Sequence, residues 1–227
     1  MPSFHNGAVE IAYLDEGEGD PIVLVHGFAS TKNVNWVYPT WVSELKKNGR
    51  RVIALDNRGH GDSAKLYDPE AYHIGTMAGD VGALMDHLKI ERADIMGYSL
   101  GARMTAWLAH RQPQRLRSAI FGGIGSGLIE GGGPGENVAE ALEAPSLDEV
   151  TDPVGRTFRA FADQTRSDLD AFRPGHQRRA AIRKCPFVQA LPASFSMIRR
   201  SGTTQTGTVK PSAIRSRKKQ LACEIVI

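Results

Sequence analysis

The chain has 227 residues, of which 41% are hydrophobic and 23% are charged, and its formal net charge is +3. This is the composition of one soluble globular domain that is long enough to bury a sizeable core. The apolar runs are too short for a membrane-spanning helix, and the N-terminal residues show no secretory signal. Two cysteines, Cys185 and Cys223, are too few for a disulfide framework or a metal-ligand cluster. We therefore expect a cytoplasmic protein that needs no metal.

Charge is distributed unevenly along the chain. Residues 174–227 hold 11 Lys and Arg but one acidic residue, Glu224, whereas residues 1–173 hold 24 acidic and 17 basic residues. A composition change this sharp predicts a boundary of some kind near residue 173.

Short apolar runs alternate with helical patterns over the first half of the chain. In chain order, we expect a strand at 8–14, a buried strand at 21–25, a helix at 35–47, a strand at 51–55, a helix with Met77, Val81, Leu84, Met85 and Leu88 on one face, a strand at 93–98, a helix at 100–110 and a strand at 117–121. Strands that alternate with helices favour a mostly parallel sheet flanked by helices, which is an α/β fold.

The pattern changes after Phe121. Residues 122–138 are rich in glycine and are typical of a loop, and residues 136–173 have helical character. From Pro174 onward there is no convincing periodicity, and the segment is basic and poor in aromatic residues. Such a segment buries too little apolar surface to offset its ordering entropy, so we predict a basic tail at 174–227 that is disordered or non-native.

Ser99 stands between two glycines, in the sequence Gly97-Tyr98-Ser99-Leu100-Gly101, where a predicted strand gives way to a predicted helix. A sharp turn there would push the hydroxyl outward, and Gly97 and Gly101 would let the strand and the helix approach closely. The amides at the start of the helix favour negative charge at the same place, which suits attack on an acyl carbon. The simpler interpretation is a serine that caps the helix.

A second stretch, His26-Gly27-Phe28, follows the buried strand at 21–25. Acyl transfer needs two backbone N–H donors for the developing oxyanion, and the amides of Phe28 and Leu100 could supply them. We expect His26 to brace this loop rather than act as a base. A third stretch at 56–63 contains Asp56 and Arg58, which could tie the loop by ion pairing, and His60, which we interpret as structural.

Taken together, "HGFAS", "DNRGHGDS" and "GYSLGA", in that order and spacing, resemble the α/β-hydrolase fold superfamily over about residues 8–173. The resemblance implies Ser99 as nucleophile and the Phe28 and Leu100 amides as oxyanion hole. Gly97, Gly101, His26 and Gly27 are the residues that we expect to give structural support. The resemblance also implies a core at 1–122 and a cap-like helical segment at 123–173. Epoxide hydrolases of this fold carry aspartate at the nucleophile position, so serine favours hydrolysis of ester-like or other acyl bonds.

The acid and the histidine that should activate Ser99 are not identifiable. After Ser99 the chain has two histidines, His110 and His176, and neither follows a predicted strand. Asp148 and Glu130 are candidate acids, both poorly placed for the family pattern. The last strands of the fold are also missing, so we expect a sheet that is incomplete at the C-terminus. A shifted reading frame near residue 173 explains this best, and a divergent member or a tail that supplies an unrecognised acid and base are alternatives.

These observations favour a serine hydrolase that works through an acyl-enzyme, with the activity of this chain left open. It would need no cofactor, and its partner would be a small acyl substrate rather than a membrane. The alternative is a non-catalytic protein that binds small molecules on the same scaffold. Nucleic-acid binding through the basic tail is weakened by the near absence of aromatic residues there. Neither the substrate nor the oligomeric state follows from the sequence.

Overall fold

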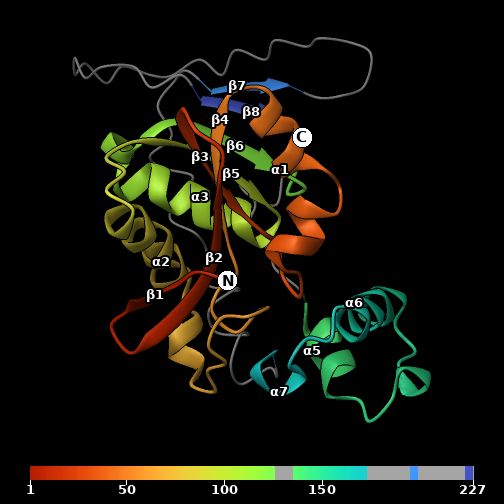
Figure 1. Ribbon diagram of the computed structural model, residues 1–227. Coiled ribbons are helices and arrows are strands. Elements are labelled where there is room, and N and C mark those ends of the chain that lie inside the picture. Colours follow the sequence, from red (N-terminus) through yellow and green to blue (C-terminus); the bar gives the residue numbers. More distant parts are fainter. Residues whose placement is uncertain (126–134, 173–194, 199–222, 227) are drawn as a thin grey trace, which may run out of the picture.

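The computed structural model describes residues 1–125 and 135–172, together with the backbone of residues 195–198 and 223–226. Its centre is a six-stranded sheet (Figure 1) with the strand order β1-β2-β4-β3-β5-β6. The strands are β1 (Ser3–Asn6), β2 (Val9–Glu16), β3 (Asp20–Val25), β4 (Arg50–Leu55), β5 (Ala93–Tyr98) and β6 (Leu116–Gly122). The pairs β3–β4, β3–β5 and β5–β6 are parallel, while β1–β2 and β2–β4 are antiparallel. The predicted α/β class with a mostly parallel sheet is therefore confirmed.

Helices cover both faces of this sheet, because the buried strands are apolar on both sides. The main helices are α1 (Trp41–Lys47), α2 (Ile74–His87) and α3 (Leu100–Arg111). In Figure 1, α1 lies on one side of the sheet and α2 and α3 lie on the other. Short helical turns η2 (Pro69–Tyr72) and η3 (Pro113–Arg115) precede α2 and β6.

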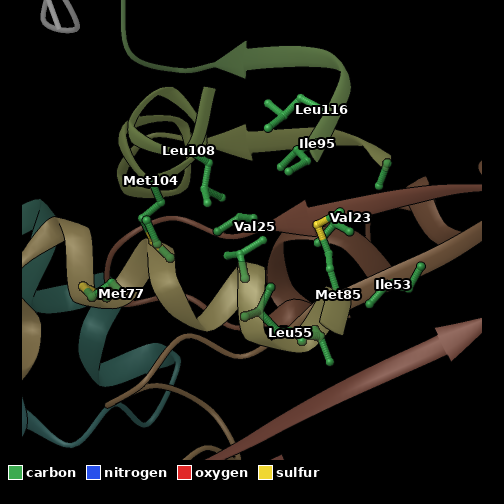
Figure 2. Close-up of a cluster of buried hydrophobic side chains, with 14 of the residues drawn as sticks. Val23, Val25, Ile53, Leu55, Met77, Met85, Ile95, Met104, Leu108 and Leu116 are labelled. Carbon is green, nitrogen blue, oxygen red and sulfur yellow. The ribbon is translucent and has the colours of Figure 1, made fainter. Parts of the chain in front are cut away.

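Successive residues of β3 point to different cores, as the period of a strand requires. Val23 and Val25 join the larger core with residues of α2 and α3 such as Met85 and Met104, and Figure 2 shows these side chains packed together. Ile22 and Leu24 join a smaller core on the opposite face. That core also contains Leu14, Trp36, Val42, Val52 and Ala54.

The prediction of one continuous helix at 35–47 is wrong, because the structure has two separate helical elements there. A π-helical turn, η1 (Asn33–Val37), and the α-helix α1 occupy the region, and Thr40 between them has a φ of 69°. Pro39 immediately precedes Thr40, and proline has no N–H with which to continue a helix. The strand β1 was not predicted, because four polar and aromatic residues at the edge of the sheet carry no clear alternation.

The helical region predicted at 136–173 contains three separate α-helices. They are α5 (Glu136–Glu143), α6 (Pro153–Gln164) and α7 (Leu169–Phe172), with the 3-10 turn η4 (Leu147–Glu149) after α5. Pro145 and Pro153 account for the break between α5 and α6, since a proline is tolerated in the first turn of a helix but not in its interior. In Figure 1 these helices form a group away from α2 and α3.

Two strands lie in the segment for which no secondary structure was predicted. They are β7 (Phe195–Ile198) and β8 (Cys223–Val226), and they pair in parallel with each other. The rest of the predicted tail lies outside the described residues. Of the helices in the described ranges, none has the length and apolar character needed to cross a membrane.

Candidate active site

Ser99 occupies the turn between β5 and α3, where the backbone is strained. Its φ is 51° and its ψ is −109°, a conformation that costs about 1–3 kcal/mol for a residue with a side chain. The main chain of Ser99 is held because its N–H donates to the Gly122 carbonyl at 2.8 Å and its carbonyl accepts the N–H of Ala102 at 3.0 Å. The side chain is partly exposed and makes no capping hydrogen bond to α3. The simpler interpretation of Ser99 as a helix cap therefore loses its main support.

Gly97 and Gly101 make room for this turn. A Cβ at Gly97 would overlap the carbonyl of Gly101 and would lie 2.5 Å from the Thr105 hydroxyl oxygen. A Cβ at Gly101 would overlap the carbonyl of Val25, at the end of β3. Real Cβ atoms do not approach backbone this closely, so α3 can lie against β3 and β5 only with glycine at both positions.

The loop after β3 brings Gly27 next to Ser99. A Cβ at Gly27 would lie 3.4 Å from the Cβ of Ser99. The Gly27 N–H donates to the Asn35 side-chain oxygen at 2.8 Å, and the Gly27 carbonyl lies 2.7 Å from Nδ1 of His26. Within the described part of the chain, neither the Phe28 N–H nor the Leu100 N–H has a hydrogen-bond acceptor. Leu100 follows Ser99 directly in the chain, and Phe28 follows Gly27, which lies next to Ser99.

His26 is fully buried and both of its ring nitrogens are occupied. Because a carbonyl only accepts hydrogen bonds, Nδ1 must donate to Gly27, and Nε2 then accepts the Asn57 N–H at 2.9 Å. Burial lowers the pKa of His26, and the neighbouring Asp56 opposes that shift only in part. This arrangement supports a bracing role and leaves His26 no lone pair for base catalysis.

His60 is also buried, and its ring packs 4.5 Å from the ring of Phe172 between centroids. Its Nδ1 donates to the Arg58 carbonyl at 2.9 Å, while Nε2 has no partner among the described residues. Burial lowers the pKa of His60 to about 3, so the ring is neutral at ordinary pH.

The loop at 56–63 is tied by ion pairs, but Asp56 and Arg58 have different partners. The buried ammonium of Lys32 lies 2.5 Å from Asp56 and 2.8 Å from Asp62. Arg58 makes a two-pronged contact with Asp80, with both hydrogen bonds at 2.7 Å. Each buried charge therefore has a partner of opposite sign, which burial requires.

The partners that acyl chemistry needs are not assembled around Ser99 by the described residues, none of which hydrogen-bonds to its hydroxyl. His110 lies in the last turn of α3, about 16 Å along the helix axis from Ser99. Asp148 is exposed in η4, where it faces Arg156 at 3.8 Å. His176 and Glu130 lie outside the described residues. Among the described residues, no three His, Cys, Asp or Glu side chains come together in a way that could hold a metal ion.

Helices α5, α6 and α7 pack against the loop that carries Phe28. The ring of Phe28 lies 5.0 Å from that of Phe172 and 6.2 Å from that of Phe158, between centroids. Ala29 is fully buried in the same apolar cluster, with Val138 and Leu142 of α5. This cluster is the third core of the molecule, and it places the region predicted as cap-like beside the candidate site.

Comparison with known proteins gives the same fold. The α/β hydrolase fold family matches residues 20–206, so the match extends beyond the resemblance noted up to residue 173. The solved structure of Est816, described as an N-acyl homoserine lactone degrading enzyme, is 25% identical with a TM-score of 0.61. The alignment covers 100% of this chain and 91% of that one.

Curated relatives match over a shorter segment. The 2-hydroxy-6-oxo-2,4-heptadienoate hydrolase of Pseudomonas putida is 34% identical over 121 residues, which is 52% of this chain and 42% of the relative. The acetyltransferase component of an acetoin cleaving system, also from Pseudomonas putida, is 41% identical over 102 residues, which is 44% of this chain and 25% of the relative. The match thus spans less than half of either relative. From the family match and the architecture together, the chain belongs to the α/β hydrolase fold family.

Proposed function

We propose that this protein is a serine hydrolase that acts on an ester-like acyl bond. Ser99 Oγ attacks the carbonyl carbon of the substrate and gives up its proton to a base, which must come from outside the described residues. The carbonyl oxygen becomes an oxyanion that accepts hydrogen bonds from the Phe28 and Leu100 N–H groups. The oxyanion then collapses, the leaving group departs with a proton, and water hydrolyses the acyl group from Ser99.

The observation that carries this proposal is the strained turn at Ser99. Strain in a residue that makes no capping bond points to a role for its partly exposed side chain. The two amides beside it, Phe28 N–H and Leu100 N–H, have no acceptor in the described part of the chain and can bind an oxyanion. A hydrolase among the curated relatives agrees with this class of reaction.

We infer the substrate class from the identity of the nucleophile and from the structurally similar protein Est816. Serine in place of aspartate favours acyl bonds over epoxides. Est816 degrades N-acyl homoserine lactones, and a lactone is a cyclic ester whose carbonyl would be attacked in the same way. We therefore propose esters and lactones as the substrate class.

The test uses p-nitrophenyl acetate, an activated ester whose leaving group needs little protonation. The full chain should release p-nitrophenol, and its Ser99 should carry an acetyl group that peptide mapping can locate. The Ser99→Ala variant should release no more than the buffer does, whereas Ser43→Ala, at an exposed serine of α1, should behave as the unaltered chain. Equal release by the unaltered chain and Ser99→Ala would refute the proposal.

A second function has one observation in its favour, because no acid or histidine among the described residues hydrogen-bonds to the hydroxyl of Ser99. On this alternative the same scaffold binds an acyl compound without turning it over. A short-chain ester would then raise the midpoint of thermal unfolding while no hydrolysis product forms and Ser99 stays unmodified.

A further inference from the structure

The carbonyl of Ala29, next to Phe28, receives its hydrogen bonds from the turn between α6 and α7. Thr165 Oγ1 lies 2.8 Å from this carbonyl oxygen and Ser167 Oγ lies 3.4 Å from it. Ala29 is fully buried, and within the described ranges no other group donates to its carbonyl. Because a buried carbonyl without a donor is costly, a hydroxyl that donates to Ala29 stabilises this loop, and Thr165 is the nearer of the two.

Thr165 has one proton and three carbonyls within reach. Besides Ala29, the carbonyls of Phe161 and Ala162 lie 3.0 Å from its hydroxyl oxygen. The Phe161 carbonyl already accepts the Thr165 N–H, and the Ala162 carbonyl already accepts the Ser167 N–H. The proton is therefore needed most at Ala29, which is also the nearest acceptor. Ser167 Oγ, 2.9 Å from Thr165 Oγ1, can donate to Thr165 in turn.

The turn that holds the two hydroxyls is itself well defined. The Arg166 N–H donates to Asp163, the Ser167 N–H donates to Ala162, and Arg166 has a φ of 53°. This is the Schellman pattern that ends many helices, and it fixes the residues that follow α6. Thr165 thus projects its hydroxyl from a rigid element.

Ala29 needs such an anchor, because its backbone is strained. Its φ is 53°, in the left-handed region that costs about 1–2 kcal/mol for a residue with a Cβ. On the other side of Phe28, the Gly27–Phe28 peptide is held through its carbonyl by Nδ1 of His26, and the preceding His26–Gly27 peptide is held through its N–H by the side chain of Asn35. Phe28 therefore sits between an anchor in the core and an anchor in the α6–α7 turn.

We propose that Thr165 is a positioning residue that couples the α5–α7 helices to the oxyanion site. By holding the Ala29 carbonyl, it keeps the loop from relaxing out of its strained form, and so keeps the Phe28 N–H beside Ser99. The inference rests on the proposed function, because it assigns the Phe28 amide to the oxyanion. The hydroxyl link between Thr165 and Ala29 can be tested separately from catalysis.

The experiment compares Thr165→Val, which keeps the shape but loses the hydroxyl, with Thr165→Ser, which keeps the hydroxyl. Thr157→Val is the matched control, because Thr157 is an exposed residue of α6 whose hydroxyl, among the described residues, bonds to Pro153 of the same helix at 2.8 Å and to no other group. Two quantities are measured on the full chain. One is hydrogen exchange at the amides of Gly27 and Lys32, which donate to Asn35 and Asp56. The other is the rate of Ser99 acylation by p-nitrophenyl acetate at saturation.

We expect Thr165→Val to speed exchange in the loop and to slow acylation, each by about tenfold, the factor that corresponds to one lost hydrogen bond to a buried carbonyl. Thr165→Ser should restore both quantities, and Thr157→Val should leave both unchanged. If Thr165→Val does not fold, Ser167→Ala should produce the same changes in smaller degree. Faster exchange without acylation in any form of the protein would support the link and refute the proposed function. Exchange in Thr165→Val equal to that in Thr157→Val would overturn the inference.

Discussion

The imidazole of His26 donates from Nδ1 to the carbonyl of Gly27 at 2.7 Å, and that carbonyl belongs to the same planar peptide as the Phe28 N–H. Fixing the oxygen of a planar peptide also fixes the direction of its N–H, on the opposite side. His26 is anchored in turn through Nε2 by the Asn57 N–H, so the orientation of the Phe28 amide is set from the next loop of the sheet.

Two substitutions at His26 should therefore differ, although each keeps one hydrogen bond. In His26→Asn the amide nitrogen can take the place of Nδ1 and hold Gly27, whereas His26→Gln can replace only the acceptor for Asn57. With the oxyanion donor misaligned, His26→Gln should lose about 10²-fold in the acylation rate of Ser99, and His26→Asn should lose much less. Stopped-flow assays with p-nitrophenyl acetate measure both. Equal losses would show that the Gly27 link does not orient the amide.

One glycine of α3, Gly101, and one glycine of α2, Gly79, offer a matched test of close packing. Gly101→Ala should destabilise the protein by at least about 2 kcal/mol, because its Cβ overlaps the Val25 carbonyl. Gly79→Ala, where nothing lies within 4 Å of a new Cβ, should instead stabilise the protein by about 0.5–1 kcal/mol through helix propensity. Urea unfolding gives both values, and two changes of the same sign would contradict the structure around Ser99.

The buried pair of Lys32 and Asp56 should be sensitive to removal of one partner. Lys32→Met leaves the Asp56 carboxylate buried without its cation, which typically costs about 3–5 kcal/mol. The exposed pair of Lys47 and Glu44 serves as control, and Lys47→Met should change stability by less than about 0.5 kcal/mol. Denaturant titration at pH 7 separates the two. If Lys32→Met lowers the free energy of unfolding by less than about 1 kcal/mol, the loop at 56–63 does not depend on this ion pair.

Acid should destabilise the protein in part through His60. Burial lowers the pKa of His60 from 6.5, the ordinary value of a histidine in an unfolded chain, to about 3 in the folded state. Between these two pKa values the unfolded chain binds a proton that the folded chain does not. The stability that this difference contributes is complete above pH 6.5 and is lost as the pH falls, by roughly 1.4 kcal/mol per pH unit between pH 6 and pH 4. His60→Asn removes the titrating group while its amide can still donate to the Arg58 carbonyl.

The measurement is the free energy of unfolding at several pH values between 7 and 4 for the unaltered chain and for His60→Asn. In the variant, the free energy of unfolding should fall less steeply with decreasing pH, by about 1.4 kcal/mol per pH unit, which corresponds to one proton. If His60→Asn and the unaltered chain have parallel curves, His60 is not kept neutral by its surroundings.

Much of the fold could be predicted because the buried strands are continuous apolar runs. The strand at 93–98 and the helix that begins at Leu100 were placed almost to the residue, because apolar periodicity and the glycines around Ser99 mark both ends. The split of the helix at 35–47 was missed, although Pro39 was a visible signal of it. The short edge strand β1 has no comparable signal, since its pairing with β2 depends on tertiary contact.

The candidate site could be predicted only as far as it lies next to the sequence motifs. Ser99, Gly27 and Phe28 come together because parallel strands end at one edge of a sheet. Asn35 and Thr165 were missed, because each reaches the loop through a long-range side-chain bond that no local pattern records. The partners of Asp56 and Arg58 were not identified for the same reason, since Lys32 and Asp80 are 24 and 22 residues away in the sequence.

Reaction of the folded chain with a fluorophosphonate probe tests most directly whether the hydroxyl of Ser99 is a nucleophile that faces two N–H donors. The phosphonyl oxygen occupies the same place as the oxyanion, so one adduct should form, map to Ser99 and disappear on unfolding or in Ser99→Ala. A folded chain that leaves Ser99 unmodified at high probe concentration, or that reacts equally well after unfolding, would contradict the account.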